Sequence, residues 1–419
     1  MGSGEKEPVR MKRLPKKLFL ATAPKIRVSY HESHVTQVMM QNGPSSKMDG
    51  SSVGSDTVLE ETFYIFSKKN TVYKVKLTEK GLLLVKDSNG QSKTETIRID
   101  DIVGASCMRR NRKSSPGSCV CGPNPRKKDL KVVDEYLYEH DENDVSAYLY
   151  IYAYVLKKYW VKSGERRERM TITLRFRSFD KFEDNVREAQ RWRTALKCLI
   201  RKRPVPGCIK YHGERELISS PVSSIDEPRQ ILVLLNPKSG PGRAKEQFQT
   251  RVAPIFCEAE VGYDLYVTKH ANYARDFVRV RDIYQWRAIV VVGGDGILFE
   301  VINGVFERPD WETVISEISF GIIPCGSGNG LAKAIAHSLH EPYDKNPYLT
   351  STLNVISGKT VPMDIVRVET TKDIMFSFLT IGWGLVADID IESEKLRAIG
   401  SQRFPIWSVA RLLGLRTYR

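Results

Sequence analysis

The stretch Ala288-Ile289-Val290-Val291-Val292-Gly293-Gly294-Asp295-Gly296 decides the fold, because a short apolar run enters a glycine-rich turn at once. Two other stretches have the same form. They are Gln230-Ile231-Leu232-Val233-Leu234-Leu235, which leads into Asn236-Pro237-Lys238-Ser239-Gly240-Pro241-Gly242-Arg243, and Phe320-Gly321-Ile322-Ile323-Pro324, which leads into Cys325-Gly326-Ser327-Gly328-Asn329-Gly330. Continuous apolar runs are typical of parallel strands buried on both faces. With helices expected at 244–252, 271–284 and 298–306 between them, the sequence predicts an α/β domain with a parallel sheet over residues 229–358.

The three glycine-rich turns predict a ligand that carries phosphate. In open α/β sheets, ligands bind beyond the carboxyl ends of the strands. Glycine allows close approach of the backbone, and the amides that begin the next helix favour an anion. One such turn is weak evidence, but three at one edge are hard to dismiss. The first turn lacks a Walker A ending, and the third is not a GxGxxG that opens a dinucleotide fold, so a P-loop enzyme and a simple Rossmann dehydrogenase fit poorly.

Asp295 is the candidate catalytic residue. Phosphoryl transfer to an alcohol needs a group that orients the hydroxyl and accepts its proton. The alternative is that Asp295 only caps a turn or a helix, which is a common role for aspartate. Glu300 follows on the next helix, where it would either contact the ligand or lie on a solvated face.

The region before the parallel sheet has a different pattern. Residues 1–56 are rich in Ser, Gly, Met and Lys, and we expect them to be disordered. Residues 57–203 read as a series of short strands, with a basic loop at 109–128, closed by an amphipathic helix that buries Trp192. This arrangement resembles a pleckstrin-homology fold. Such a module would dock on a membrane or a partner, or would only pack against the rest of the chain. Residues 204–228 read as a linker.

Composition sets broad limits. The 419 residues are 41% hydrophobic and 27% charged, a globular balance, and the net charge of +15 favours anionic partners. No run of apolar residues reaches 18, so we expect no transmembrane helix. The run Leu18-Phe19-Leu20-Ala21 is too short for the core of a signal peptide. Seven scattered cysteines indicate a reducing cytosol, and the spacing of Cys119 and Cys121 argues against a metal site.

The motifs resemble a known family. Leu235-Asn236-Pro237-Lys238-Ser239-Gly240, Val292-Gly293-Gly294-Asp295-Gly296 running to Glu300-Val301-Ile302-Asn303-Gly304, and Ile323-Pro324-Cys325-Gly326-Ser327-Gly328-Asn329 are similar to the diacylglycerol kinase catalytic domain, whose superfamily includes sphingosine and ceramide kinases. A fourth segment, Phe378-Leu379-Thr380-Ile381-Gly382-Trp383-Gly384-Leu385-Val386-Ala387-Asp388-Ile389-Asp390-Ile391-Glu392-Ser393-Glu394-Lys395 with Arg397, Gly400, Arg403 and Phe404, resembles sphingosine kinases in particular. The resemblance covers residues 229–419.

This resemblance implies an ATP-dependent kinase that phosphorylates sphingosine or a related sphingoid base, with Mg²⁺ accompanying ATP. Asp295 would be the catalytic base. The loop of Gly293, Gly294, Asp295 and Gly296 would border the lipid headgroup, and Asp390 would bind the sphingoid amine. The positions implied to lie along ATP are Asn236, Pro237, Lys238, Thr268, Lys269, His270, Ala271, Asn272, Glu300, Gly326, Ser327, Gly328, Arg397 and Arg403. The sequence names no ligands for Mg²⁺.

Elementary chemistry supports the role of Asp390. Sphingosine carries an ammonium near the hydroxyl it offers, and a carboxylate opposite it gains a charge-assisted hydrogen bond. Diacylglycerol and ceramide have no such cation, so a buried aspartate would go unpaired at a cost. The alternative is that Asp388 and Asp390 are acidic residues that stabilise a helix N-terminus. Arg397 and Arg403 suit phosphate because guanidinium binds it bidentately, or else they lie on a solvated helix surface.

Family members continue beyond Arg419. We therefore expect residues 359–419 to be part of a β-rich lipid-binding lobe that opens with strands at 361–368 and 375–381, and activity to be weak or absent if that lobe is incomplete. The alternatives are a catalytically impaired docking or regulatory protein, a diacylglycerol or ceramide kinase, and an enzyme like NAD kinase, which also uses a Gly-Gly-Asp-Gly loop. The expected partners are a sphingoid lipid and an anionic membrane surface, reached reversibly from the cytoplasm, and no nucleic acid.

Overall fold

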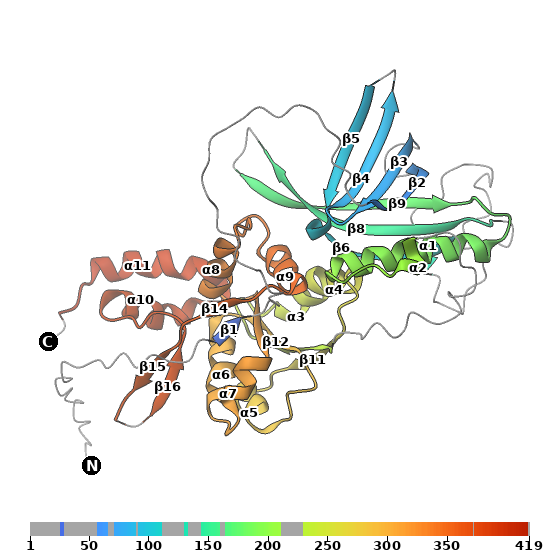
Figure 1. Cartoon of the computed structure of the whole chain (residues 1–419). Helices are drawn as coiled ribbons and strands as arrows, with labels where there is room; N and C mark the ends of the chain where they lie inside the picture. The colour runs from blue at the N-terminus through green and yellow to red at the C-terminus, as the bar shows by residue number, and fades with distance from the viewer. Residues whose placement is uncertain are drawn as a thin grey trace, which may run out of the picture.

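The computed structural model describes residues 26–28, 57–65, 71–88, 91–110, 130–132, 144–159, 164–210, 229–371 and 373–417. An antiparallel sheet with one long helix comes first in the chain. An α/β sandwich follows, and a hairpin with two helices extends from its far side (Figure 1). The predicted α/β domain is confirmed, as is an antiparallel β domain before it.

The parallel sheet has the strand order β11-β10-β12-β13-β1-β14. Its strands are β1 (Ile26–Val28), β10 (Ile231–Leu235), β11 (Tyr263–Val267), β12 (Ala288–Gly293), β13 (Ser319–Pro324) and β14 (Val361–Met363). All neighbours are parallel except β14, which pairs antiparallel with β1. The sequence reading did not predict β11, an edge strand whose mixed Tyr-Asp-Leu-Tyr-Val composition lacks the apolar run of its neighbours.

The register of the central strands brings their carboxyl ends to one edge. Leu235 pairs with both Val267 and Val292, and Gly293 pairs with Pro324. Each strand therefore ends at nearly the same level. The loops that follow β10, β11, β12 and β13 must leave the sheet side by side, as the shared edge of parallel strands requires.

Helices cover both faces of this sheet, which explains why β10 and β12 are apolar throughout. On one face, the alternate side chains of β10 and β12 pack with α3 (Ala244–Gln247), a π-helical turn (Phe248–Val252), α4 (Ala253–Glu258) and α9 (Pro347–Ser357). On the other face, the remaining side chains pack with α5 (Tyr273–Val280), α6 (Asp295–Phe306), α7 (Trp311–Glu317) and α8 (Gly330–Ser338). A strand buried on both sides has no position for a polar side chain.

The N-terminal domain is an eight-stranded sheet in the order β5-β4-β3-β2-β9-β8-β6-β7. Its elements are β2 (Thr57–Ile65), β3 (Thr71–Thr78), β4 (Gly81–Ser88), β5 (Gln91–Arg98), a 3₁₀ turn (Ile99–Asp101), β6 (Ile102–Arg110), β7 (Leu130–Val132), β8 (Ala147–Lys158), β9 (Glu165–Phe176) and α1 (Phe182–Ile200). Trp192 of α1 is buried, as predicted, with edge contacts to Phe63 and Phe176. The expected basic loop falls mostly outside the described residues.

Several expected boundaries differ from the structure. Strand β1 comes from the segment expected to be disordered, and β14 extends the parallel sheet past the expected limit at residue 358. The expected linker begins with the short helix α2 (Gly207–Lys210), whose Ile209 is buried in the core of the N-terminal domain. Local composition does not reveal these additions, because each depends on a partner that is distant in sequence.

The C-terminal segment has strands within or close to the expected ranges 361–368 and 375–381, and it then continues as helices. The hairpin of β15 (Val366–Glu369) and β16 (Ile374–Ser377) is followed by α10 (Leu385–Ser393), a 3₁₀ helix (Glu394–Gln402) and α11 (Arg403–Leu413). Gly384, with φ of 71°, turns the chain into α10. An ion pair of 2.7 Å from Arg411 to Asp388 holds α11 against α10. Among the described residues, none of the helices combines the length and apolar character that a membrane span needs.

Candidate active site at the carboxyl edge of the parallel sheet

A cavity of about 1270 Å³ lies at this edge, between the loops of the parallel sheet and the segment from Leu379 to Ser408. Most of the predicted site residues line it. These are Asn236, Pro237, Lys238, Thr268, Lys269, His270, Ala271, Gly294, Asp295, Gly296, Glu300, Gly326, Ser327, Gly328, Asp390 and Arg403. Residues separated by more than 160 positions in the chain thus border one space.

The glycines of two loops touch each other through their backbones. A Cβ atom added to Gly326 would lie 2.4 Å from Cα of Gly294, which is closer than atoms can approach. Gly240 has φ of 55°, and a Cβ there would lie 2.6 Å from the carbonyl oxygen of Cys325. Glycine is therefore required at these positions so that the loops after β10, β12 and β13 can pack together and leave their amides beside the cavity.

Asparagine side chains stabilise two of the loops. Asn329 accepts a hydrogen bond from the amide of Gly326 at 2.9 Å and donates to the carbonyl oxygen of the same residue at 2.8 Å. Asn236 accepts from the amide of Lys238 at 3.0 Å. Both side chains replace backbone partners that a tight turn cannot supply.

Asp295 is held by the N-terminus of a second helix. Its Oδ2 accepts from the amide of Gly330 at 2.8 Å, and its Oδ1 accepts from the amide of Leu331 at 3.1 Å, so the carboxylate caps α8. Burial raises the pKa of Asp295 above the ordinary aspartate value, against these two hydrogen bonds, which lower it. The capping role considered from the sequence is therefore present, and it leaves the carboxylate at the cavity wall with a fixed orientation.

Glu300 also caps a helix. Its Oε2 accepts from the amide of Ala274 at 3.2 Å, in the first turn of α5, and the side chain lines the cavity. A solvated helix face, our alternative for this residue, is not what the structure shows. Asn272 begins α5 with φ of 63°, a left-handed conformation that asparagine tolerates. Its neighbours from Thr268 to Ala271 border the cavity.

Asp390 and Arg403 form an ion pair in the cavity wall. Nη2 of Arg403 donates to Oδ1 of Asp390 at 3.0 Å, and Nη1 donates to Glu394. The side chain of Arg403 is only 5% exposed, whereas that of Asp390 is 65% exposed. Arg403 is therefore not on a solvated surface, and Asp390 lies beyond the first turn of α10, where Asp388 is the acidic residue. Asp390 is also exposed and paired, so it is not the buried aspartate that we expected to go unpaired with an uncharged lipid.

Residues 230–368 match the model of the diacylglycerol kinase catalytic domain. Sphingosine kinase 2 from Homo sapiens is 39% identical over 286 residues, which are 68% of this chain and 41% of that protein. Sphingosine kinase 1 from Homo sapiens is 41% identical over 202 residues, which are 48% of this chain and 52% of that protein. The chain is a relative of the sphingosine kinases.

The chain spans about half the length of the curated relatives it matches. A solved diacylglycerol kinase from Bacillus anthracis str. Sterne aligns with it at 22% identity and a TM-score of 0.26, over 33% of this chain and 42% of that chain. At that score the alignment supports no argument about the site.

Not every predicted site residue lines the cavity. Gly293 and Asn272 are not among the residues that line it, and Arg397 belongs to the 3₁₀ helix, although its side chain is not described. Ser239, Gly240, Thr380 and Phe404, which the sequence analysis quoted in its motifs without assigning them to a ligand, also line the cavity. Sequence reasoning overlooked Ile297 and Ser408, which line it as well. It also overlooked Tyr343, whose phenol lies near Asp295. Burial raises the pKa of Tyr343 to about 12, and the negative charge of Asp295 adds to that rise. Its position in an irregular loop offers no sequence signal.

Proposed function

We propose that the chain transfers the γ-phosphate of ATP to the primary hydroxyl of sphingosine or a related sphingoid base, and so forms a sphingoid 1-phosphate. One observation carries this proposal: Asp295 and Asp390 line the same cavity that the three glycine loops border. A lipid that reaches this cavity would meet a carboxylate suited to its hydroxyl and another suited to its amine.

The proposed reaction assigns one step to Asp295. It accepts the proton of the lipid hydroxyl while the hydroxyl oxygen forms a bond to the γ-phosphorus. The bond from that phosphorus to the oxygen bridging it to the β-phosphate breaks, and ADP leaves with the electron pair. The raised pKa of Asp295 makes it a better proton acceptor than an ordinary aspartate, and its two hydrogen bonds to α8 keep it in position.

ATP would lie across the glycine loops. Its phosphates carry several negative charges, which the loop amides favour, and Lys238 adds a positive charge at the cavity wall. Mg²⁺ enters as part of the MgATP substrate. Within the described part of the chain, no three acidic, histidine or cysteine side chains gather as a metal site. Phosphate oxygens of ATP and water molecules are the usual ligands of Mg²⁺ in such a substrate.

Asp390 supports a sphingoid base over an uncharged lipid. Its side chain stays largely exposed to the cavity while Arg403 holds one of its oxygens. An ammonium of the substrate would reach the other oxygen and gain a charge-assisted hydrogen bond. Diacylglycerol and ceramide offer no such group.

For the N-terminal domain, we propose a pleckstrin-like fold that serves a cytoplasmic protein attached reversibly to anionic membrane. The support is its architecture, an antiparallel sheet closed by α1, together with the net charge of +15 of the chain. Docking of this kind would bring the cavity close to the membrane surface, where its lipid substrate resides.

An assay with labelled ATP would test the proposed reaction. We expect phosphorylation of sphingosine to exceed that of diacylglycerol, ceramide and NAD. Transfer to ceramide or diacylglycerol alone would contradict the role of Asp390, and transfer to NAD alone would contradict a lipid substrate. Binding to anionic liposomes without turnover, and without a thermal shift on addition of ATP, would favour a docking or regulatory protein.

A further inference from the structure

The N-terminal domain packs closely on the α/β domain. The apolar part of their contact consists of Val103, Tyr150, Tyr152, Tyr154, Ile255 and Leu349, from β6, β8, α4 and α9. A Cβ added to Gly104 would lie 2.0 Å from the carbonyl oxygen of Glu258, so the two backbones touch. Figure 1 shows β8 and β9 running along the side of the α/β domain that carries α4, α8 and α9.

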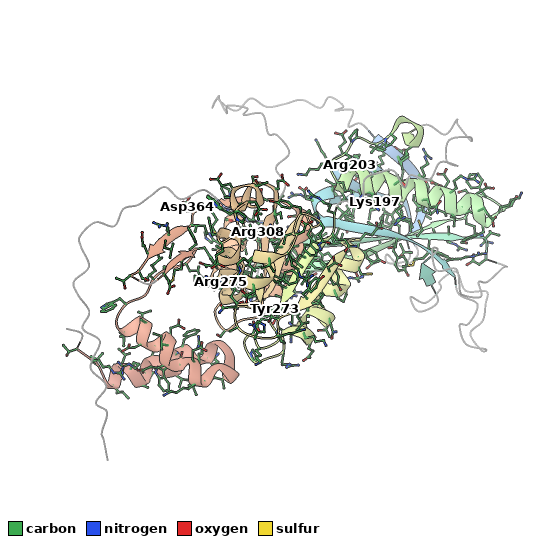
Figure 2. All side chains as sticks on the ribbon, turned by 90° about the horizontal axis from the view of Figure 1, so that it is seen from below. Lys197, Arg203, Tyr273, Arg275, Arg308 and Asp364 are labelled. Atoms are coloured by element: carbon green, nitrogen blue, oxygen red, sulfur yellow. The ribbon has the colours of Figure 1, made fainter. Side chains whose placement is uncertain are left out.

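Ion pairs cross the same contact. Arg169 donates from Nε to Glu258 at 2.9 Å, and Arg193 and Lys197 each lie 2.7 Å from Glu260. Lys197 projects from α1 in Figure 2. The acceptors Glu258 and Glu260 belong to the end of α4, which lies on the opposite face of the sheet from α8.

Arg167 of β9 contacts the turn that follows α8 instead of α4. Its Nε and Nη2 donate to the two carboxylate oxygens of Glu341 at 2.9 and 2.6 Å. Its Nη1 donates to the carbonyl oxygen of Tyr154 at 2.8 Å and also bonds Asp101. The side chains of Arg167 and Glu341 are 15% and 18% exposed. A two-point bond from a planar guanidinium fixes both the distance and the orientation of the carboxylate.

Glu341 lies in the turn that follows the C-terminal end of α8 (Gly330–Ser338). Its amide donates to the carbonyl oxygen of Ala336 at 2.8 Å, after the chain turns at His340 with φ of 56°. At the other end of this helix, the amides of Gly330 and Leu331 hold Asp295. A helix of nine residues is about 14 Å long and behaves as a stiff rod. Arg167 is therefore hydrogen-bonded to Glu341 just beyond the C-terminal end of α8, and Asp295 is hydrogen-bonded to the amides at its N-terminal end.

We propose that Arg167 is a positioning residue for the phosphoryl-transfer site: by fixing Glu341 it fixes α8, and α8 holds the carboxylate of Asp295. The N-terminal domain then contributes to phosphoryl transfer, because its Arg167 makes a contact beside α8 that the α/β domain lacks by itself. The effect on rate rests on the proposed function, whereas the coupling between Arg167 and α8 does not.

Hydrogen exchange on the full chain tests the coupling without any substrate. In Arg167→Ala, we expect exchange in peptides covering 328–346 to rise about fivefold or more, since local opening follows the loss of buried bonds. Arg167→Lys retains one bond and should give an intermediate rise. The matched control is Arg169→Ala, which breaks an ion pair at α4 and should affect residues 253–260 instead. Unchanged exchange in 328–346 for Arg167→Ala, or an equal rise for Arg169→Ala, would overturn the proposal.

Turnover provides the second measurement. We expect kcat to fall about tenfold or more in Arg167→Ala, because displacing a catalytic group by about 1 Å can cost a factor of about 100. KM for ATP should change by no more than about twofold, and Arg169→Ala should keep kcat within about twofold. An unchanged kcat in Arg167→Ala would overturn the positioning role. If the unmodified chain phosphorylates no lipid, the proposed function fails, and hydrogen exchange still decides whether Arg167 holds α8.

Discussion

Nη2 of Arg403 donates to Oδ1 of Asp390 at 3.0 Å, so two residues that the sequence assigned to different ligands contact each other directly. The arginine is buried and the carboxylate is exposed to the cavity. This pairing orients Asp390 and leaves its second oxygen accessible. It also places the proposed amine site beside a guanidinium that was expected to bind phosphate.

We expect Asp390→Asn to raise KM for sphingosine by about 10- to 100-fold, because a hydrogen bond to a charged group is worth about 1.5–3 kcal/mol. KM for ATP should stay nearly constant. The control is Asp388→Asn on the same helix, which loses its ion pair with Arg411 and should lower the melting temperature without raising KM for sphingosine. Equal KM values for Asp390→Asn and the unmodified chain would remove Asp390 from the amine site. Steady-state kinetics with each substrate varied in turn provide the measurement.

Asp295→Asn should lower kcat by a factor of about 100 to 10,000, the usual contribution of a positioned base. Asparagine has one acceptor oxygen, so one of the two hydrogen bonds to α8 should persist and ATP should still bind. A full rate in this variant would exclude Asp295 as the base.

The pH dependence of kcat provides a second test of Asp295. The base acts when deprotonated, so kcat should fall as pH decreases through its pKa. Because burial raises that pKa, the fall should begin above the pH expected for an ordinary aspartate. A rate that stays constant down to the pH where the protein unfolds would contradict this assignment.

Gly326→Ala should destabilise the folded chain by about 1–3 kcal/mol or more, since its Cβ would overlap the backbone of Gly294 and force the two loops apart. Gly328→Ala is the matched control in the same loop, where a Cβ would meet no atom within 4 Å. Thermal unfolding without ligand should therefore show a lower melting temperature only for Gly326→Ala. The same loss in both variants would mean that contact between the loops is not the cause.

Arg308 stabilises the C-terminus of α5, and Figure 2 shows it on the α/β domain near Arg275. It donates to the carbonyl oxygens of Val278 and Arg281 and forms a two-point bond with Asp310. We expect Arg308→Ala to lower the free energy of unfolding by about 1–3 kcal/mol, the value of hydrogen bonds from a charged donor. Chemical denaturation measures this change.

The pairing with Arg308 lowers the pKa of Asp310 to about 2. A lowered pKa stabilises the folded state above the ordinary aspartate value of 3.8 and loses that effect as pH falls toward 2. The stability difference between the unmodified chain and Asp310→Asn should therefore shrink over that range. Asp276→Asn, which removes a more exposed partner of Arg279, should show a smaller difference. A difference that is independent of pH would contradict the ion pair.

Much of the site follows from sequence alone because its signals are local. Three apolar runs that end in glycine turns predict parallel strands, and parallel strands place their carboxyl ends at one edge. The structure confirms this placement through the pairing of Leu235 with Val292 and of Gly293 with Pro324. The need for glycine at 240 and 326 is a further local signal, although the atoms that require it belong to other loops.

The amino-acid sequence by itself thus determined where the strands and turns lie and which carboxylates are candidates for the site, since each of these depends on residues within a few positions. Only the tertiary structure decided which groups hold those carboxylates. Asp295 is bonded to amides 35 and 36 positions away, and Arg167 is bonded to Glu341 across 174 positions. Such contacts leave no periodic pattern in the sequence, because packing of whole elements brings the partners together.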